Sequence, residues 1–454
     1  MGDTITVAKD QEFPQLREIT NEQLLNQVIG EHISTISPPS GDHLNSWKIK
    51  RVYYKPGDEC RFMFTANIAN NGSNGASEQL FFGKLFYLLD AKEVFKRQKA
   101  QALVTPKYGP AVTYIPRWKM VLWAYPNDPE IAGLPKMFAN QNILKLAQAN
   151  PENFGMHTAP TGIKREMKKY VPGKRCGFVY TMNSAPSETN DSPPAHKVFG
   201  KIYENDDGAN AYHVMTQLWN SDARKKGQLI FPQAYSYDSK NKILWQESLT
   251  GQSLAKYAGD LENLPVLATE IGLRLAALHN TRIELPKIMS IDFLLAELEK
   301  SVTAVSRNFP NHAKACVAIQ KKLHATVNQL ESGFESTVHA SFKFSHIFES
   351  EKGIAFIDFD GANIGDPGYD VGRFLSRFYR MKAFHKISPR LAKQSIRNFR
   401  EAYNQLANKP MSQKRINWFT ASHLVSSDIY KLVKRADPVN LSKLLHLADQ
   451  LCPW

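Results

Sequence analysis

Cysteine is scarce in this chain of 454 residues, and the spacing of the few cysteines excludes two kinds of site. The four of them are Cys60, Cys176, Cys316 and Cys452. They show no metal-ligand spacing, and they are too few to form the framework of a disulfide-stabilised domain. We therefore expect free thiols and, with them, a protein of the reducing cytoplasm.

Long apolar runs are also missing from the sequence. No run of about 18 apolar residues occurs, so we expect no membrane-spanning helix. Residues 1–10 include acidic side chains and have no apolar centre, so they do not resemble a secretory signal. Hydrophobic residues make up 43% of the chain and charged residues 22%, which is typical of a globular protein. The length of the chain predicts two or three domains or lobes.

Acidic residues are fewer than basic ones, 43 against 57, which gives a formal net charge of +14. An anionic ligand such as a nucleotide would suit this charge. Residues 373–400 contain no Asp or Glu, and Arg390, Lys393 and Arg397 would share one face of a helix. This stretch, with its interleaved aromatic residues, is either a solvated basic face, which we favour, or a surface for an acidic substrate or nucleic acid.

The first half of the chain contains an internal repeat. A Tyr-x-Pro-Gly segment begins at Tyr54 and again at Tyr170, an offset of 116 residues. A Phe-Gly-Lys segment follows in each copy and ends at Lys84 and Lys201. The pattern of each copy predicts a strand, a Pro-Gly turn, two further strands of which the second ends near the lysine, a helix and two more strands. We interpret the copies as two small lobes in tandem; the alternative is one larger β-rich domain with a chance likeness.

The second half is dominated by helical periodicity. We expect helices at 264–280, 290–307, 310–332, 388–407, 412–433 and 437–451, and a short strand near 353–359. Residues 69–78 and 184–196 are rich in Asn, Ser, Gly and Pro and should form exposed hairpin loops. The predicted division is a leader at 1–45, a first lobe with a linker at 46–162, a second lobe at 163–247 and a helical domain at 248–454.

Within the helical half lies a segment with the layout of a phosphoryl-transfer loop. Such a loop supplies His-x-Asp and then an Asn five residues after the Asp, and the following strand presents an Asp to magnesium. Here His339 keeps its place, but Ser341 stands at the position of the catalytic Asp and His346 at that of the Asn. Asp358 falls twelve residues after His346, about where the metal-binding Asp is expected. The spacing is kept, while two chemically decisive residues are changed.

The residues after Asp358 carry a resemblance to a known family. They include Gly365-Asp366-Pro367 and Asp370, a pattern that resembles the aminoglycoside phosphotransferase and choline kinase-like family. The resemblance implies an α+β, protein-kinase-like bilobal fold with an antiparallel β small lobe and a helical large lobe, here preceded by a duplicated small-lobe-like domain. It also implies ATP as the nucleotide, Mg²⁺ or Mn²⁺ as the metal, and a small-molecule acceptor that the sequence does not identify.

The second copy of the repeat is the better candidate for the nucleotide side. Its Pro-Gly turn is followed by Lys174 and Arg175, whereas Asp58 and Glu59 follow the turn of the first copy and would repel phosphates. The resemblance makes Lys201 the candidate for the lysine that grips the α- and β-phosphates. The alternative for Lys201 is an ordinary surface lysine at the end of a strand.

Two other elements of the nucleotide side are predicted from the resemblance. Glu247 and Leu249 lie in a stretch that resembles the family's hinge, where an extended backbone hydrogen-bonds adenine. A kinase small lobe also orients its lysine with a Glu from a helix. The helix expected near 209–221 has no Asp or Glu within it, so either Asp206 or Asp207 substitutes from its start or the ion pair is absent.

Three residues are candidates for holding the metal. Asp358 comes first, because a carboxylate at the end of an apolar strand suits magnesium, and a capping role is the alternative. Asp360 would face the same side as Asp358 in an extended strand. His346 is the third candidate, although imidazole suits manganese or zinc better than magnesium.

The catalytic loop has lost its base. Ser341 cannot act as a general base near neutral pH, and such a base typically contributes about 10²–10⁴ in rate. Since phosphoryl transfer rests mainly on positioning and charge neutralisation, this loss should slow the reaction rather than forbid it. Lys343 either neutralises the transferring phosphoryl group or points outward. His339 and Asp370 are expected to brace the loop.

Three functions are compatible with these residues. The first is a divergent, slow ATP-dependent phosphotransferase that acts on a small molecule. The second is a catalytically degenerate nucleotide-binding pseudokinase that serves as a sensor or scaffold. The third is a basic adaptor in which the extra lobe is only an interaction surface. The test that separates them first is nucleotide binding.

Overall fold

The structure is a computed structural model that describes nine segments of the chain. These segments are 10–33, 43–55, 57–69, 77–184, 195–257, 262–285, 288–330, 335–434 and 437–452. The predicted hairpin loops fall largely outside them, as do residues 1–9. The chain forms two compact units, Met1–Asp206 with Asp238–Ile243, and Asp207–Tyr237 with Leu244–Trp454.

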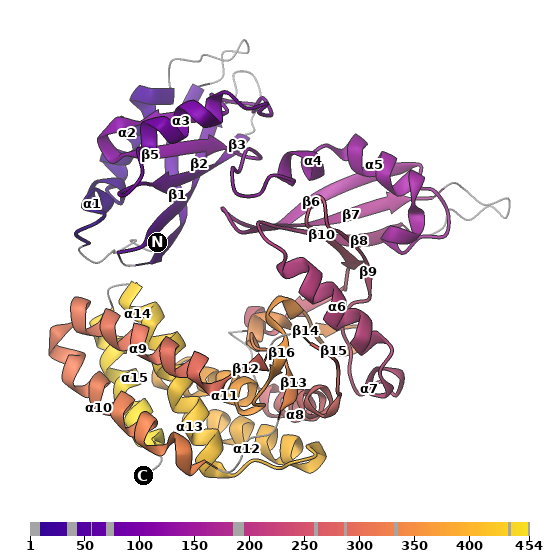
Figure 1. Ribbon diagram of the computed structural model, residues 1–454, viewed down its shortest axis with the longest axis vertical. Helices are drawn as coiled ribbons and strands as arrows, with labels where there is room; N and C mark the ends of the chain where they lie inside the picture. The colour runs from indigo at the N-terminus through magenta and orange to yellow at the C-terminus, as the bar shows by residue number, and fades with distance from the viewer. Residues whose placement is uncertain are drawn as a thin grey trace. The chain divides into compact units, whose positions relative to one another are not determined.

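The first unit contains a five-stranded sheet in its N-terminal part (Figure 1). Its strands are β1 (His43–Lys55), β2 (Glu59–Ala69), β3 (Ser77–Leu85), β4 (Val112–Ile115) and β5 (Met120–Ala124). Their order is β1-β2-β3-β5-β4, and all of the neighbours are antiparallel. Helix α3 (Ala91–Lys99) lies between β3 and β4 in the chain, as the pattern of the first copy predicts.

Part of the predicted leader belongs to the core of this first sheet. Residues 16–33 form two helices, α1 (Leu16–Ile19) and α2 (Glu22–Ile33). Phe13, Leu25 and Ile29 are at most 2% exposed and pack in one cluster with Trp47 and Phe64 of the sheet. Because burial of such side chains contributes about 1.5–3 kcal/mol each, these residues stabilise the first lobe rather than lead up to it.

A second five-stranded sheet follows, with the same relative strand order. Its strands are β6 (Gly162–Val171), β7 (Arg175–Asn183), β8 (His196–Tyr203), β9 (Ala234–Asp238) and β10 (Ile243–Glu247), in the order β6-β7-β8-β10-β9. Helices α4 (Leu134–Phe138) and α5 (Asn140–Ala149) occur in the linker between the sheets. In each sheet the lysine of the repeat pairs with an equivalent position, Lys84 with Arg61 and Lys201 with Gly177. That the sheets are copies of one ancestral lobe stays our interpretation.

The second unit is mostly helical. Its helices are α6 (Asp207–Trp219), α7 (Asp222–Lys225), α8 (Leu264–Asn280), α9 (Ile291–Asn308), α10 (Pro310–Thr326), α11 (Gly368–Ala383), α12 (Pro389–Leu406), α13 (Gln413–His423), α14 (Tyr430–Lys434) and α15 (Pro438–Leu451). The predicted helices are present, although α10 ends earlier than expected and a π-helical stretch, Leu424–Ile429, separates α13 from α14. Antiparallel sheets followed by helices confirm the α+β fold class. No helix in the described segments is long and apolar enough to cross a membrane.

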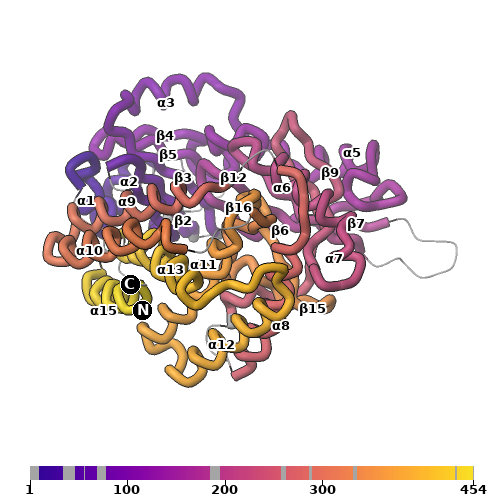
Figure 2. Tube along the Cα trace, turned by 60° about the horizontal axis from the view of Figure 1, so that its bottom comes forward, coloured from indigo at the N-terminus to yellow at the C-terminus, as the bar shows by residue number. Residues whose placement is uncertain are grey.

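Short strands and close helix packing position the predicted catalytic segment. One small sheet has the order β11 (Gln252–Ser253), β14 (Ile347–Ser350), β15 (Gly353–Phe356), and another has the order β12 (Ile288–Met289), β16 (Asn363–Gly365), β13 (Ser336–Val338). Helices α8 and α12 lie side by side (Figure 2). A Cβ at Gly272 of α8 would lie 2.6 Å from the carbonyl oxygen of Phe399 of α12, so only glycine permits this approach.

A buried histidine in this helical core predicts sensitivity to acid. His423 of α13 is 0% exposed, and its ring lies 4.5 Å from that of Tyr369. Burial lowers the pKa of His423 from 6.5 to about 3. The unfolded chain therefore binds a proton at this residue below about pH 6.5 that the folded protein does not accept, and stability falls as the pH drops from that value towards 3.

Replacement of His423 by Leu is expected to flatten this acid limb. The loss of stability per pH unit should shrink by up to about 1.4 kcal/mol, measured by urea unfolding between pH 7 and pH 4. The matched control is His446→Leu, because His446 of α15 is exposed. Equal pH slopes for the parent and His423→Leu would contradict the prediction.

Candidate functional site

The predicted catalytic loop is anchored at its start by His339. The backbone N–H of His339 donates to Oδ2 of Asp370 at 2.6 Å, and its Nε2–H donates to the carbonyl oxygen of Ile357 at 2.9 Å. A carbonyl can only accept, so Nε2 carries the hydrogen. The His339 side chain is fully buried. It thus links the loop after β13 to the start of α11 and to the end of β15, in the arrangement expected of a bracing residue.

Asp370 extends this anchor to two further helices. It is 0% exposed, and its Oδ2 lies 3.2 Å from Nε2 of His279 at the end of α8. Nδ1 of His279 lies 2.8 Å from the hydroxyl of Tyr403 on α12. A buried carboxylate must be hydrogen-bonded to be tolerated, and here its partners are the loop backbone and a histidine of the core. The position of the loop is therefore fixed by α8, α11 and α12 together.

Ser341 lies beside the turn that follows the predicted metal strand. Ala340 has a φ of +55°, which directs the chain from His339 into the loop. A Cβ at Gly361 would lie 3.9 Å from Cβ of Ser341 and 3.8 Å from the carbonyl oxygen of His339. Ser341 itself is half-buried. The two segments that the motif relates by spacing are thus neighbours in space.

Asp358 follows the end of β15 and contacts His346. It has φ +70° and ψ 58°, a left-handed conformation that Asp adopts more readily than most residues. Its Oδ2 lies 3.0 Å from Nε2 of His346, and the two side chains are 13% and 4% exposed. Burial lowers the pKa of His346 to about 3, although Asp358 acts in the opposite direction. A neutral imidazole that faces a carboxylate presents its N–H, so in this arrangement His346 orients Asp358 and its Nε2 offers no lone pair to a metal.

The expectation that Asp358 and Asp360 face the same side depended on an extended strand, which is absent at these residues. Phe359–Gly361 is a 3₁₀ turn rather than extended strand, so alternation of side chains does not apply there. Oxygens of the turn accept hydrogen bonds from Asn210 of α6, at Asp360 O (3.2 Å) and Ala362 O (3.1 Å). The turn is therefore tied to α6 within this unit.

The described segments contain no cluster of three or more His, Cys, Asp or Glu side chains that could enclose a metal ion. This does not disfavour magnesium at Asp358. Mg²⁺ is usually bound by one or two carboxylates together with water and substrate phosphates, not by an all-protein cage. A single carboxylate such as Asp358 fits that requirement, whereas a zinc site would need more protein ligands.

Lys343 stands between Ser341 and His346 in extended conformation. Its carbonyl oxygen accepts the backbone N–H of His346 at 2.8 Å, which closes the 3₁₀ turn Phe344–His346. Its charge helps to lower the pKa of His346, so the ammonium acts electrostatically on the candidate metal side of the loop. Whether it meets a phosphoryl group stays a prediction.

The two repeat lysines have different surroundings in the first unit. Lys84 is ion-paired with Glu130, and its Nζ lies 3.7 Å from Oε1 of Glu59. Lys201 is 9% exposed, and its Nζ lies 4.9 Å from the ring centroid of Tyr203, within cation–π range. Two carboxylates therefore neutralise Lys84, and the choice of the second copy as the nucleotide side stays a prediction.

The Pro-Gly turn of the second copy differs from what its sequence suggests. The turn was expected to offer backbone amides to phosphate, but the N–H of Gly173 donates to Oδ2 of Asp128 at 2.6 Å and that of Lys174 to the carbonyl oxygen of Val171 at 3.0 Å. The side chain of Lys174 is 47% exposed and lies 3.1 Å from Glu204. Arg175 begins β7, opposite Tyr203. In this conformation the turn offers cationic side chains rather than these two amides.

The predicted hinge is held at both ends within the second unit. The N–H of Glu247 donates to the carbonyl oxygen of Gln233 at 2.8 Å, and its carboxylate pairs with Lys352. Gly251 has a φ of +120°, and a Cβ there would lie 2.1 Å from the carbonyl oxygen of Glu349. Of the two predicted adenine contacts, the amide of Glu247 is thus already used, and the backbone of Leu249 between these anchors remains the candidate.

The basic stretch 373–400 is less suited to nucleic acid than its sequence suggests. Arg390, Lys393 and Arg397 are exposed on one face of α12, as predicted. The interleaved aromatic residues do not join them, because Phe378 and Phe399 are 0% exposed and pack in the core. Bases therefore have no aromatic platform from these two rings.

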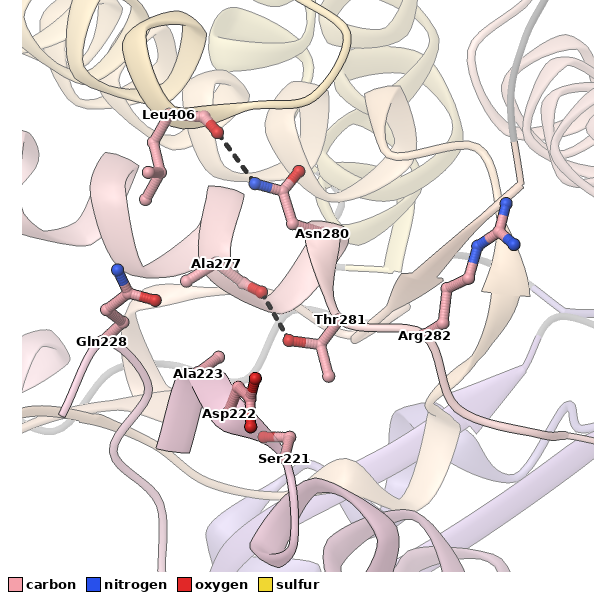
Figure 3. Close-up of a pocket in the computed structure, with 9 residues that line it drawn as sticks. All are labelled: Ser221, Asp222, Ala223, Gln228, Ala277, Asn280, Thr281, Arg282 and Leu406. Atoms are coloured by element: carbon pink, nitrogen blue, oxygen red, sulfur yellow. Dashed lines mark hydrogen bonds between the residues drawn. The ribbon is translucent and has the colours of Figure 1, made fainter. Parts of the chain in front are cut away.

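A cavity of about 330 Å³ is lined by none of the predicted catalytic residues (Figure 3). Its lining residues come from α7 and the residues beside it, from the end of α8 and the residues after it, and from the end of α12: Ser221, Asp222, Ala223, Gln228, Ala277, Asn280, Thr281, Arg282 and Leu406. Several of the polar groups are already used, since Asn280 donates to the carbonyl oxygen of Leu406 and Thr281 to that of Ala277. Sequence reasoning gave no signal for this cavity, which forms from three separate segments.

Comparison with known proteins relates part of this chain to a protein family. Residues 204–408 match the family model described as "Phosphotransferase enzyme family". A search of curated proteins found no match.

Solved structures with a similar fold include three kinases. Choline kinase from Cryptosporidium parvum Iowa II is 12% identical, with a TM-score of 0.47 and coverage of 69% of this chain and 95% of that one. Plasmodium vivax ethanolamine kinase is 13% identical, with a TM-score of 0.45 and coverage of 79% and 94%. A thermostable mutant of aminoglycoside phosphotransferase APH(4)-Ia, in a ternary complex with ADP and hygromycin B, is 14% identical, with a TM-score of 0.44 and coverage of 69% and 97%. The family predicted from the motif around Asp358 is confirmed by the sequence match, which covers residues 204–408 and identifies them as similar to the phosphotransferase enzyme family.

Proposed function

We propose that this chain is a divergent ATP-dependent phosphotransferase that acts slowly on a small molecule. The observation that carries the proposal is the anchored loop. His339 and Asp370 hold the loop so that Ser341 lies next to the turn after Asp358, although Ser341 has lost the carboxylate of a catalytic base. An enzyme that keeps this positioning retains most of what phosphoryl transfer requires.

Each residue has a distinct role in this proposal. Asp358 holds a magnesium ion through one carboxylate, and the ion, when bound, neutralises charge on the phosphates. Lys201 grips the α- and β-phosphates from β8, with Lys174 and Arg175 as further cations near the turn. Ser341 orients the acceptor hydroxyl or amine without removing its proton. Lys343 adds positive charge near the loop.

The catalytically degenerate nucleotide-binding module is the second candidate, and one observation favours it. The carboxylate of Asp358 is 13% exposed and faces the neutral ring of His346 at 3.0 Å. A carboxylate so enclosed needs reorientation before it can meet a solvated metal ion. A protein that binds nucleotide weakly and does not turn it over would be compatible with this site.

Turnover assays separate these two candidates. We expect ADP formation from ATP with Mg²⁺ or Mn²⁺ to rise when the correct hydroxylated or amino-bearing acceptor is added, measured at high protein concentration over hours. Nucleotide binding without ADP formation for any acceptor would favour the degenerate module. Absence of nucleotide binding would leave the basic adaptor.

The two repeat lysines provide a matched pair of variants. Lys201→Ala is expected to weaken ATP binding at least about tenfold, because a desolvated charge-assisted contact to phosphate contributes about 1.5–3 kcal/mol. Lys84→Ala should weaken ATP binding much less than Lys201→Ala, since Glu130 and Glu59 already neutralise Lys84. Both affinities are measured by calorimetry. If Lys84→Ala were the damaging change, the assignment of the nucleotide side would be reversed.

A further inference from the structure

The first sheet contacts the Pro-Gly turn of the second sheet through one buried arginine. Arg61 of β2 is 3% exposed, and its Nη1 donates to the carbonyl oxygens of both Pro172 and Gly173 at 3.0 Å. Arg61 pairs directly with Lys84 of β3, so the two side chains project from the same face of the sheet. The turn therefore lies on the face of the first sheet that carries the repeat lysine.

A carboxylate completes this contact. Glu130 accepts from Arg61 at 3.3 Å and pairs with Lys84, while Nη2 of Arg61 lies 2.8 Å from Glu59. Two cations and two carboxylates thus alternate beneath the turn. Gly173 has a φ of +65°, and a Cβ there would lie 2.2 Å from Oε2 of Glu130 and 2.5 Å from Nη1 of Arg61. Only glycine allows the backbone to approach these side chains so closely.

Asp128 binds the same turn at a backbone N–H group, whereas Arg61 binds it at two carbonyl oxygens. It is 4% exposed, and its Oδ2 accepts the N–H of Gly173 at 2.6 Å and the hydroxyl of Tyr170 at 2.8 Å. With Arg61 on the carbonyls and Asp128 on the amide, both kinds of backbone group in the turn are bound by residues from before the second sheet. Pro172 and Gly173 are consequently buried, while Lys174 next to them is exposed.

The turn of the first copy has an equivalent carboxylate, but the carbonyl oxygen of its Gly57 accepts from the hydroxyl of Tyr87 at 3.3 Å rather than from an arginine. Oδ2 of Asp10 accepts the N–H of Gly57 at 2.9 Å and also the hydroxyl of Tyr54, so it corresponds to Asp128. At the position that corresponds to Arg61, the second copy has Gly177, which has no side chain to hold another turn. Within the described residues, the arginine that holds the turn of the other copy is therefore found on the first sheet and has no counterpart on the second.

We propose that the first sheet serves to hold the nucleotide-side turn of the second, and that Arg61, Asp128 and Glu130 are positioning residues for nucleotide binding. These three residues are called the turn clamp below. In this proposal the first sheet binds a segment of its own chain instead of a nucleotide. The segment is the turn of the second copy, and it lies on the face of the first sheet that carries Lys84. Because the turn is held, Lys174 and Arg175 are presented without the entropic loss of ordering it. The functional half of this inference rests on the proposed nucleotide binding.

Release of the clamp is expected to have two measurable effects. In Arg61→Ala and in Asp128→Ala, amide hydrogen exchange over residues 170–175 should accelerate in the nucleotide-free protein, because the turn loses its partners. ATP affinity with Mg²⁺, measured by calorimetry, should fall at least about tenfold, the equivalent of ordering one backbone residue. The conservative variants Arg61→Lys and Asp128→Asn should have smaller effects in the same direction, and they provide the test if the alanine variants fail to fold.

The matched control is Asp10→Ala, which removes the equivalent carboxylate from the turn of the first copy. It should accelerate exchange near residues 54–58 and leave both exchange at 170–175 and ATP affinity unchanged. Unchanged exchange at 170–175 in the clamp variants would overturn the proposal, as would faster exchange with unchanged or tighter ATP binding. A parent protein that binds no ATP would instead overturn the proposed function, and the exchange measurement would still report whether the clamp holds the turn.

Discussion

Asp358→Asn is expected to abolish most of the stabilisation that ATP with a divalent cation gives to this protein. Asp358 is the single carboxylate that both the motif and the end of β15 assign to the metal, and an amide brings no negative charge to a magnesium ion. For the parent protein at a nucleotide concentration 100 times the Kd, binding should add about 2.7 kcal/mol of stability. The measurement is the melting temperature over a titration of ATP, with Mg²⁺ and Mn²⁺ in parallel.

The control for this variant separates metal binding from general stability. Asp449→Asn also removes one carboxylate, but Asp449 is a surface residue, 49% exposed, that pairs with Lys322. It should leave the nucleotide-dependent shift intact. A shift that persists in Asp358→Asn would remove Asp358 from the metal site, and a parent protein with no shift at millimolar ATP would favour the adaptor.

Ser341→Asp is expected to raise the rate of phosphotransfer or ATP hydrolysis by up to about 100-fold. The anchor formed by His339 and Asp370 does not involve the Ser341 side chain, so the loop should keep its position in the variant. Ser341 is half-buried, which leaves a new carboxylate partly hydrated and able to ionise. His346→Asn should add to the gain under Mg²⁺, because an amide oxygen is the better ligand and the contact of Nε2 with Asp358 is removed.

ADP formation at saturating ATP is the measurement for this pair of variants. The matched control is Ser345→Asp, which places the same charge in the same loop at an exposed position. It should leave the rate at the level of the parent protein. If neither Ser341→Asp nor its combination with His346→Asn turned over faster than the parent, the site would be a binding site, and the degenerate module would be the better description of the chain.

The sequence by itself determined the elements of this fold and the relation between its motifs. Apolar periodicity is a local property, so most helices from α8 to α15 and the succession of strands and helix along each copy of the repeat could be predicted from it. The spacing from His339 to Asp370 likewise predicted which residues belong to one site, because only short elements separate the residues of this motif. The family followed from these residues, whereas the two helices within the predicted leader were not expected from the sequence.

Tertiary structure alone decided which polar groups remain available for chemistry. Asp360 lies in a 3₁₀ turn after Asp358, and the alternation of side chains along an extended strand does not apply in such a turn. The amide of Gly173 is bound by Asp128, and the carbonyls of its turn are bound by Arg61, whose position is 112 residues earlier in the chain than Gly173. Hydrogen bonds between such distant residues depend on how the sheets pack, and a sequence pattern records residue types and spacing but not the partner that a buried polar group finds.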